Sequence, residues 1–434
     1  MSPARLYYIT WGRLVAADFH VHNLGCKVNR AESDMLVSRL LSAGGLPVTQ
    51  EEASVILVNT CTVTAEADAK TRKAVRRAAA AAKQPWVIAT GCAIAVDRAS
   101  YEALGERVFA EPDRLAALQK AAELLALQLP SETNSFEELR QGEAFATRRG
   151  IKIQDGCDNN CSYCIVRIAR GAARSVPQKD VIDQILTAER AGIREIILTG
   201  VNIGAYSFGR ADLLKIIEES ISSTEQLRLR LSSLEPQHVS DGLLTFMAQS
   251  EGRLCAHLHL PLQSGCDKTL KEMQRLYDTG YFSQLVTDAR SLMPHVSLTT
   301  DVIVGFPGET EEDFSQSLAF CESMRFAKMH VFRYSQRLGT PSAQRSDQLA
   351  PDLIARRAAR MREAAVRMQR YDGESRVGSI ESVLIERAGR GTSESYHKVK
   401  TPAEIEVGSL TPLQIVGHHD NLLLAAQVQS LTAH

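Results

Sequence analysis

Three closely spaced cysteines are the residues of this sequence best suited to metal chemistry. Cys157, Cys161 and Cys164 form a C-x3-C-x2-C pattern in GCDNNCSYC. Three such thiolates can ligate three irons of a [4Fe–4S] cluster and leave the fourth iron without a protein ligand. An open position of this kind distinguishes a reactive metal site from a closed structural one. The alternative is a structural zinc site, but that normally has a fourth ligand and paired C-x2-C spacing, which this segment lacks.

A second set of three cysteines is suggested by topology, because the residues are far apart in the chain. Cys26, Cys61 and Cys92 each follow a short β-type run, at residues 19–23, 55–59 and 87–90. Helical stretches at 30–43 and 65–82 separate these runs, which predicts βα units and a parallel sheet. Ligands bind at the carboxyl edge of such sheets, so the three thiols could hold a second cluster there. Three ordinary buried cysteines are the alternative interpretation.

The first set of cysteines belongs to a longer βα pattern. Helix-like stretches, including 178–191, 212–222 and 311–324, alternate with strand-like runs. The runs lie at 151–154, 195–199, 227–232, 256–260, 298–304 and 328–334. Six repeats are fewer than a complete eight-fold barrel requires, so we expect an open, partial (β/α)6 barrel with its chemistry at the carboxyl ends of the strands.

The predicted fold class is α/β, with three domains. We expect an open parallel α/β domain at 18–130, the partial barrel at 146–350 and a small β-barrel at 373–434. A polar linker is predicted at 130–141, and a basic amphipathic helix at 351–370 connects the second and third domains. A length of 434 residues agrees with about three domains.

Composition indicates a cytoplasmic protein without a membrane span. Hydrophobic residues make up 44%, and no stretch approaches the roughly 18 consecutive apolar residues that a span needs. No export signal is evident at the amino terminus. Clustered cysteines in this setting are metal ligands or redox groups before they are disulfides. The net charge of −1 means that any contact with RNA must be local.

The motifs resemble those of one enzyme family. The C-x3-C-x2-C pattern on a partial barrel resembles the radical S-adenosylmethionine (SAM) superfamily. The segments LGCKVNRAESD, NTCTVTAEADAKTRKAVRR and ATGCAI around the other three cysteines resemble the methylthiotransferases within it. The resemblance extends from about Phe19 over nearly the whole chain, through LTGVNIGAYS, RLRLSSLEP, HLHLPLQSGCDKTLKEM, TTDVIVGFPGETEEDF and HVFRYSQRLGTP.

This resemblance implies two [4Fe–4S] clusters and SAM as cofactors. One SAM would provide the radical and another the methyl group, and the second cluster would supply sulfur. Tyr163 occupies the aromatic position that lies beside the SAM adenine in the superfamily. No catalytic residues are expected beyond the cluster ligands. Further SAM contacts are predicted at strand ends, at Gly200, Asn202, Ser233, Gln263 and Gly305.

The words LGCKVN and NTCTVT resemble the branch that converts N6-threonylcarbamoyladenosine, next to the tRNA anticodon, to its 2-methylthio form. Sister branches modify isopentenyladenosine in tRNA or an aspartate of a ribosomal protein. The implied partners are the tRNA anticodon loop, SAM and an electron donor. The carboxyl-terminal domain resembles the RNA-binding TRAM barrel. The predicted RNA contacts are Arg72, Arg76, Arg170, Arg174, Tyr396 and Lys398.

Two other classes of protein remain as alternatives, an iron–sulfur electron carrier and a noncatalytic RNA-binding protein. A carrier favours clusters that are fully ligated by protein, unlike the triad with an open iron. Among the remaining residues, His257 and His259 alternate on one strand face, and we expect them to pack inside the barrel rather than bind a metal. Cys255, Cys266 and Cys321 have no ligand spacing and are interpreted as ordinary thiols.

Overall fold

The computed structural model describes residues 9–10, 13–14, 17–130 and 147–428. The linker predicted at 130–141 therefore lies, apart from Pro130, outside the described residues. The chain divides into two compact units. Unit 1 is Met1–Arg140 with Ile165–Ala172, and unit 2 is Gln141–Cys164 with Ala173–His434. Within the described ranges, no helix has the length and apolar character needed to span a membrane.

Unit 1 is built on a five-stranded parallel sheet with strand order β4-β3-β5-β6-β7. Its strands are β3 (Asp18–Asn23), β4 (Leu46–Pro47), β5 (Val55–Thr60), β6 (Trp86–Gly91) and β7 (Val108–Ala110). The central strand, VILVNT, is buried along its whole length, as is typical of a strand covered on both faces. The predicted parallel α/β fold of this part of the chain is confirmed.

Helices cover both faces of this sheet. Ile56 and Val58 pack with helix α2 (Ala65–Ala79), while Val55 and Leu57 pack with α1 (Lys27–Ser42) and α5 (Arg114–Leu124). Alternation along the strand therefore directs neighbouring side chains into two separate cores. The other elements of unit 1 are the short pair β1 (Ile9–Thr10) and β2 (Arg13–Leu14), with α3 (Cys92–Val96), α4 (Arg98–Glu102) and α6 (Val166–Arg170). Helix α6 contacts α3.

Unit 2 contains the predicted partial barrel. Strands β8, β10 and β13 are parallel in one sheet, strands β14, β15 and β16 are parallel in another, and a bridge between Ser233 and His259 joins the two series. The strands are β8 (Arg148–Asp155), β10 (Glu195–Gly200), β13 (Arg228–Leu231), β14 (His257–His259), β15 (Ser297–Val304) and β16 (Lys328–Arg333). Each overlaps one of the six runs expected from the sequence.

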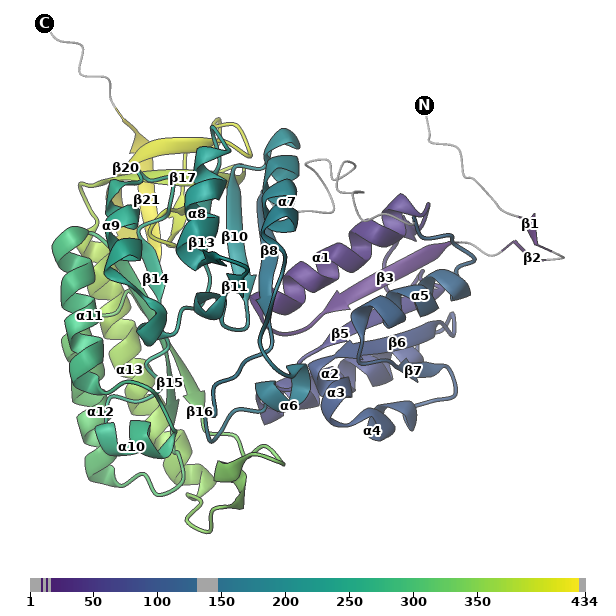
Figure 1. The fold of residues 1–434 in the computed structure, drawn as a ribbon, viewed down its shortest axis with the longest axis horizontal. Coiled ribbons are helices and arrows are strands. Elements are labelled where there is room, and N and C mark those ends of the chain that lie inside the picture. Colours follow the sequence, from purple (N-terminus) through teal and green to yellow (C-terminus); the bar gives the residue numbers. More distant parts are fainter. Residues whose placement is uncertain (1–8, 11–12, 15–16, 131–146, 429–434) are drawn as a thin grey trace, which may run out of the picture. The chain divides into compact units, whose positions relative to one another are not determined.

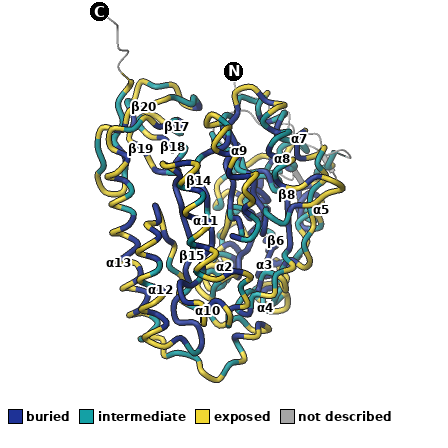
Figure 2. Tube along the Cα trace, turned by 60° about the vertical axis from the view of Figure 1, so that its left-hand side comes forward, coloured by how far each residue is buried: buried dark blue, intermediate teal, exposed yellow. Residues whose placement is uncertain are grey.

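Helices follow the strands and pack on their outer face. These are α7 (Gln178–Arg190), α8 (Leu213–Ser222), α9 (Asp241–Gln249), α11 (Thr279–Leu292) and α12 (Glu311–Met324). Leu298, Val302 and Val304 of β15 pack into the core with α11 and α12, which lie beside the strands in Figure 1. The intervening Thr299 and Asp301 point to the opposite, inner face. Figure 2 shows β14 and β15 in the colour of buried residues.

The carboxyl-terminal part of unit 2 is a long helix followed by a closed barrel. Helix α13 (Pro351–Ser375) packs against α12 and β16. The barrel order is β17-β18-β19-β21-β20. Its strands are β17 (Ile380–Arg387), β18 (Arg390–Ser393), β19 (Lys398–Lys400), β20 (Leu410–His419) and β21 (Leu422–Gln427). Val383, Ile385, Val399, Leu413 and Leu423 fill it. The predicted small β-barrel is confirmed.

Short elements complete unit 2. They are β9 (Arg174–Ser175), β11 (Ser207–Phe208), β12 (Ala211–Asp212), α10 (Asp267–Glu272) and the 3-10 turns Ile203–Ala205, Pro236–His238 and Pro341–Gln344.

Gly305, which directly follows β15, has a backbone and a setting that only glycine accommodates well. Its φ is +78°, and an added Cβ would lie 2.5 Å from Cγ1 of Ile354. We expect Gly305→Ala to lower the free energy of unfolding by about 2 kcal/mol or more, because strain and overpacking add. Gly209→Ala is the matched control, since its φ is +63° but no atom lies within 4 Å of the added Cβ. Denaturant unfolding of both variants measures the difference, and equal losses would show that Ile354 is not the obstacle.

Candidate iron–sulfur sites

The cysteines of unit 1 lie at the same edge of three neighbouring strands. Cys26 is the N-cap of α1 after β3, Cys61 directly follows β5, and Cys92 begins α3 after β6. Because β3, β5 and β6 are adjacent and parallel, their carboxyl ends meet. The structure therefore brings together at one edge three residues that the sequence separates widely.

Side-chain contacts show how close these loops come. Gly25, with φ +106°, approaches Cys61 so closely that an added Cβ would lie 2.6 Å from Cβ of Cys61. Burial raises the pKa of the Cys61 thiol to about 11, and the neighbouring sulfurs of Cys26 and Cys92 act in the same direction. A ligated metal is what stabilises such a group as a thiolate. The three sulfurs are thus near enough to influence one another.

The donor set fits an iron–sulfur cluster. Three cysteines from three loops supply thiolates, which are the ligands that such clusters use. Among the described residues, no three His, Cys, Asp or Glu side chains are grouped closely enough to hold one metal ion. A cluster separates its ligands more widely, because irons and sulfides stand between them. The arrangement therefore suits a cluster better than a single zinc ion.

Arg170 of α6 lies beside this triad. Its Nε donates to Sγ of Cys92 over 3.1 Å, and its Nη1 and Nη2 donate to the carboxylate of Glu32 over 2.8 and 3.1 Å. The Arg170 side chain is only 3% exposed. Surface contact with an RNA phosphate, predicted for Arg170 from the sequence, requires an accessible guanidinium. The prediction is therefore corrected. Arg170 belongs to the basic run that follows Cys164, but its side chain points inward to the carboxylate of Glu32 and the sulfur of Cys92.

The other triad lies in the loop that follows β8 in unit 2. The backbone N–H of Cys164 donates to the carbonyl of Cys161, and the three cysteines are partly exposed. Ser162 fastens the loop, because its N–H donates to the Met273 carbonyl and its hydroxyl to that of Glu272. The carbonyl of Ser162 in turn accepts from the N–H of Ser342. The loop is thus positioned before any cofactor binds.

Arg275 is the counterpart of Arg170 at this triad, and sequence reasoning did not single it out. Its Nη1 donates to Sγ of Cys161 over 3.1 Å and lies 3.5 Å from the hydroxyl of Tyr163. Its guanidinium also forms an ion pair with Glu235, and its Nε donates to the Tyr277 hydroxyl. Burial raises the pKa of the Tyr163 hydroxyl well above its ordinary value. The only sequence signal was a lone arginine two residues beyond a family-like segment.

The predicted SAM contacts lie at or just beyond strand ends, as expected. The backbone N–H of Asn202 donates to the Gln154 side chain over 2.8 Å. Ser233 forms an isolated parallel β-bridge with His259. Gln263 has a φ of +66°, a strained value for a non-glycine residue that is often found at functional sites. The space a side chain would occupy is filled at Gly200 by Gln154 and Ile203, and at Gly305 by Ile354. These two glycines serve packing, and their role toward SAM stays a prediction.

The predicted RNA contacts fall into two groups. Arg76, Arg174 and Lys398 are exposed, although Arg174 pairs with Asp155 and Lys398 with Glu386. Arg72 is partly buried and forms ion pairs with Asp68 and Asp97. Exposed ion pairs contribute little free energy to stability, so the exposed Arg76, Arg174 and Lys398 remain available to bind phosphate.

Tyr396 is half-buried and packs against residues of the partial barrel. Its ring lies 4.7 Å from the guanidinium of Arg230 and 4.8 Å from the ring of His257. The tyrosine thus joins the carboxyl-terminal barrel to the inner face of the partial barrel. The base-stacking role predicted for Tyr396 stays a prediction.

His257 and His259 pack on the inner face, as expected. Thr299 contacts both, with its hydroxyl 3.1 Å from Nε2 of His257 and 2.9 Å from Nδ1 of His259. His259 also lies 3.3 Å from the Asp301 carboxylate. These contacts hold both imidazoles on the inner face of the partial barrel.

Ser395, His397 and Asp372 form a chain of contacts that superficially resembles a catalytic triad. The Ser395 hydroxyl lies 3.0 Å from Nδ1 of His397, whose Nε2 lies 3.0 Å from Asp372. However, Ser395 is 3% exposed and its hydroxyl donates to Glu381. A nucleophile must reach its substrate. We therefore interpret the chain as structural.

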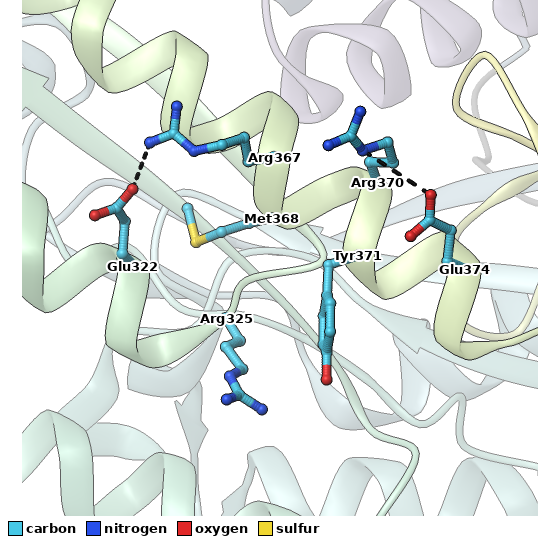
Figure 3. A pocket seen from close by; sticks show the side chains of 7 residues that line it. All are labelled: Glu322, Arg325, Arg367, Met368, Arg370, Tyr371 and Glu374. Atoms are coloured by element: carbon cyan, nitrogen blue, oxygen red, sulfur yellow. Dashed lines mark hydrogen bonds and ion pairs between the residues drawn. The ribbon is translucent and has the colours of Figure 1, made fainter.

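A cavity of about 380 Å³ lies between the ends of α12 and α13 (Figure 3). Arg367 pairs with Glu322, Arg370 lies near Glu374, and the guanidinium of Arg325 is 5.4 Å from the ring of Tyr371. No cysteine lines this cavity. The cavity therefore offers no thiolate for a cluster.

Comparison with known families matches both triads. Residues 151–321 match the radical SAM superfamily, and residues 18–109 match an uncharacterized protein family, UPF0004. The fold of the chain also resembles that of a solved structure. That protein is the radical S-adenosylmethionine methyltransferase TsrM from Kitasatospora setae, with cobalamin and a [4Fe–4S] cluster bound (TM-score 0.55, 14% identity, 76% of this chain and 77% of that chain).

Curated relatives extend over most of the chain. The Treponema pallidum protein named threonylcarbamoyladenosine tRNA methylthiotransferase MtaB is 32% identical over 87% of this chain and 92% of its own length. The protein of the same name from Thermotoga maritima is 35% identical over 74% and 76%. A protein from Endomicrobium trichonymphae, named tRNA-2-methylthio-N(6)-dimethylallyladenosine synthase, is 30% identical over 95% and 99%.

Proposed function

Because the chain belongs to the radical SAM methylthiotransferase family, we propose that it converts N6-threonylcarbamoyladenosine, next to the tRNA anticodon, to 2-methylthio-N6-threonylcarbamoyladenosine. The observation that carries the proposal is the pair of cysteine triads, each at the carboxyl edge of parallel strands in its own unit. Four relatives with 32–35% identity are named for the threonylcarbamoyl substrate. Relatives named for the dimethylallyl substrate follow at 30–31%.

The cofactors of this family are two [4Fe–4S] clusters and SAM. When bound, one cluster would supply the electron that cleaves SAM, and the other would supply the sulfur that is transferred. An unactivated C–H bond requires such radical chemistry. Cys157, Cys161 and Cys164 would hold the first cluster, and Cys26, Cys61 and Cys92 the second. Tyr163 would lie against the SAM adenine. Arg275 and Ser162 hold the first triad's loop in place.

Recognition of tRNA would use local basic groups, since the overall charge is near neutral. An adenine attacked at a ring carbon must leave its stack, which suits a single-stranded anticodon loop. Arg76, Arg174 and Lys398 are exposed and suited to phosphate contact. The closed barrel within 373–434 would serve as a TRAM-like RNA-binding domain. The other two proposed domains are at 18–130 and 146–350. A tRNA substrate would suit a cytoplasmic protein, and the radical reaction would need an electron donor as partner.

Mass spectrometry of tRNA nucleosides from a deletion strain tests the proposed substrate. We expect loss of 2-methylthio-N6-threonylcarbamoyladenosine, with accumulation of the unmethylthiolated nucleoside, and restoration by the intact gene but not by Cys161→Ala. The 2-methylthio isopentenyl nucleoside should stay unchanged. Its loss instead, with the threonylcarbamoyl product intact, would assign the chain to the dimethylallyl branch.

A further inference from the structure

We propose that Arg170 is a positioning residue for the cluster on Cys26, Cys61 and Cys92, here called the second cluster. Its guanidinium donates a hydrogen bond to the Cys92 sulfur, and this bond holds the ligand in place and stabilises the reduced cluster. The inference rests on the proposed function only in requiring a cluster on Cys26, Cys61 and Cys92. It assigns a role to a residue of α6, which is remote in sequence from all three.

Two N–H groups of the Arg170 guanidinium hold it in one orientation by pairing with a carboxylate. Nη1 and Nη2 donate to the two oxygens of Glu32, so Nε points at Sγ of Cys92. Bidentate pairing of this kind fixes geometry as well as charge. Glu32 is itself held by Arg114 of α5, at 2.8 Å from Nε to the carboxylate, and its side chain is 2% exposed. Two arginines and one carboxylate leave a net positive charge beside three thiolates.

The same network reaches the loops of the other two cysteines. Nη2 of Arg170 donates to Oδ1 of Asn29 over 2.8 Å. Nδ2 of Asn29 donates to the carbonyl of Leu24 over 2.7 Å and to that of Thr60 over 2.8 Å. Leu24 lies two residues before Cys26, and Thr60 directly precedes Cys61. Arg170 and Asn29 therefore connect the three loops that carry the second triad.

The contact to sulfur has an electrostatic consequence. Hydrogen bonds to the sulfurs of an iron–sulfur cluster help set its reduction potential. Because reduction adds negative charge, a cationic donor stabilises the reduced form more than the oxidised form. Loss of the Arg170 donor should therefore make the potential more negative. Ordinary packing would not have this effect.

The test isolates the second cluster. Cys157, Cys161 and Cys164 are replaced by alanine in the full chain, and the remaining cluster is reconstituted and titrated anaerobically by electron paramagnetic resonance. In this background we compare Arg170→Gln, Arg170→Lys and the control Arg114→Gln. The control removes the ion pair between Arg114 and Glu32 and leaves the Arg170 side chain, which donates to Cys92, in place.

We expect Arg170→Gln to lower the ratio of reduced to oxidised cluster about tenfold at the parent midpoint, which is a shift of about 59 mV for one electron. Arg170→Lys should recover part of the shift, because it keeps the charge, and Arg114→Gln should show much less. An unchanged potential and spectrum in Arg170→Gln, with full iron content, would overturn the proposal.

Loss of iron is also decisive. Iron loss from Arg170→Gln with the parent's melting temperature supports the positioning role. Equal iron loss and equal loss of thermal stability in Arg114→Gln would reduce Arg170 to general packing. A parent protein that binds no cluster on Cys26, Cys61 and Cys92 would contradict the proposed function itself, and this result is distinguishable because it precedes any change at Arg170.

Discussion

Replacement of Cys61 by alanine should abolish methylthio transfer to tRNA while the enzyme still cleaves SAM. Cys61 belongs to the triad of unit 1, whereas the loop of Cys157, Cys161 and Cys164 lies in unit 2. Removal of one thiolate leaves too few ligands for the cluster of that triad and does not touch the other. Anaerobic assays with reduced, reconstituted enzyme should therefore detect 5′-deoxyadenosine but no methylthio nucleoside above background.

The reciprocal variant completes the test. Cys161→Ala should lose both products, because no radical forms and no substrate is activated. Cys321→Ala is the matched control, since that thiol is fully buried and lies on α12, outside both triads. It should retain both activities. Methylthio transfer by Cys61→Ala, or loss of SAM cleavage in that variant with its first cluster intact, would contradict the division of roles between the triads.

The sequence predicted the elements that carry the cysteines because these depend on local patterns. The predicted run VILVN is mostly apolar and rich in β-branched residues, and β5 extends one residue beyond it. The alternation of strands and helices after residue 150 predicted the partial barrel for the same reason. The convergence of Cys26, Cys61 and Cys92 followed from topology alone, because parallel neighbouring strands end at one edge.

The roles of Arg170, Tyr396 and Arg275 were not predictable in this way. A basic run indicates a solvated or RNA-binding face, but Arg170 meets Glu32, which lies 138 residues earlier in the chain. Tyr396 meets His257 and Arg230 across a comparable separation. No periodicity records such pairings, since each depends on how finished elements pack. Buried charges are the residues for which local sequence patterns mislead most, because they need partners from elsewhere in the fold.

A buried charge network joins the partial barrel to the carboxyl-terminal barrel. Glu195 of β10 is fully buried, and its carboxylate pairs with Arg228 over 2.6 Å and with Arg230 over 3.0 Å. Burial tends to raise the pKa of Glu195, but the charges of Arg230 and Arg228 outweigh it and hold this pKa well below the ordinary value. The arginines also donate to backbone carbonyls of the small barrel, at Ser382, Thr392, Ser393 and Glu394.

Arg230→Met should therefore loosen the small barrel from the partial barrel. The change leaves part of the Glu195 charge and the carbonyls of Ser393 and Glu394 without their donors, and breaking a buried pair typically costs about 3–5 kcal/mol. The protection of the β17 and β18 backbone amides against hydrogen exchange should then fall about a hundredfold or more, while the amides of β5 in unit 1 keep their protection. Arg190→Met, at an exposed arginine of α7, should change protection little. Full protection of β17 and β18 in Arg230→Met would show that apolar contacts alone hold the small barrel, because the charge network would then contribute nothing measurable to the junction.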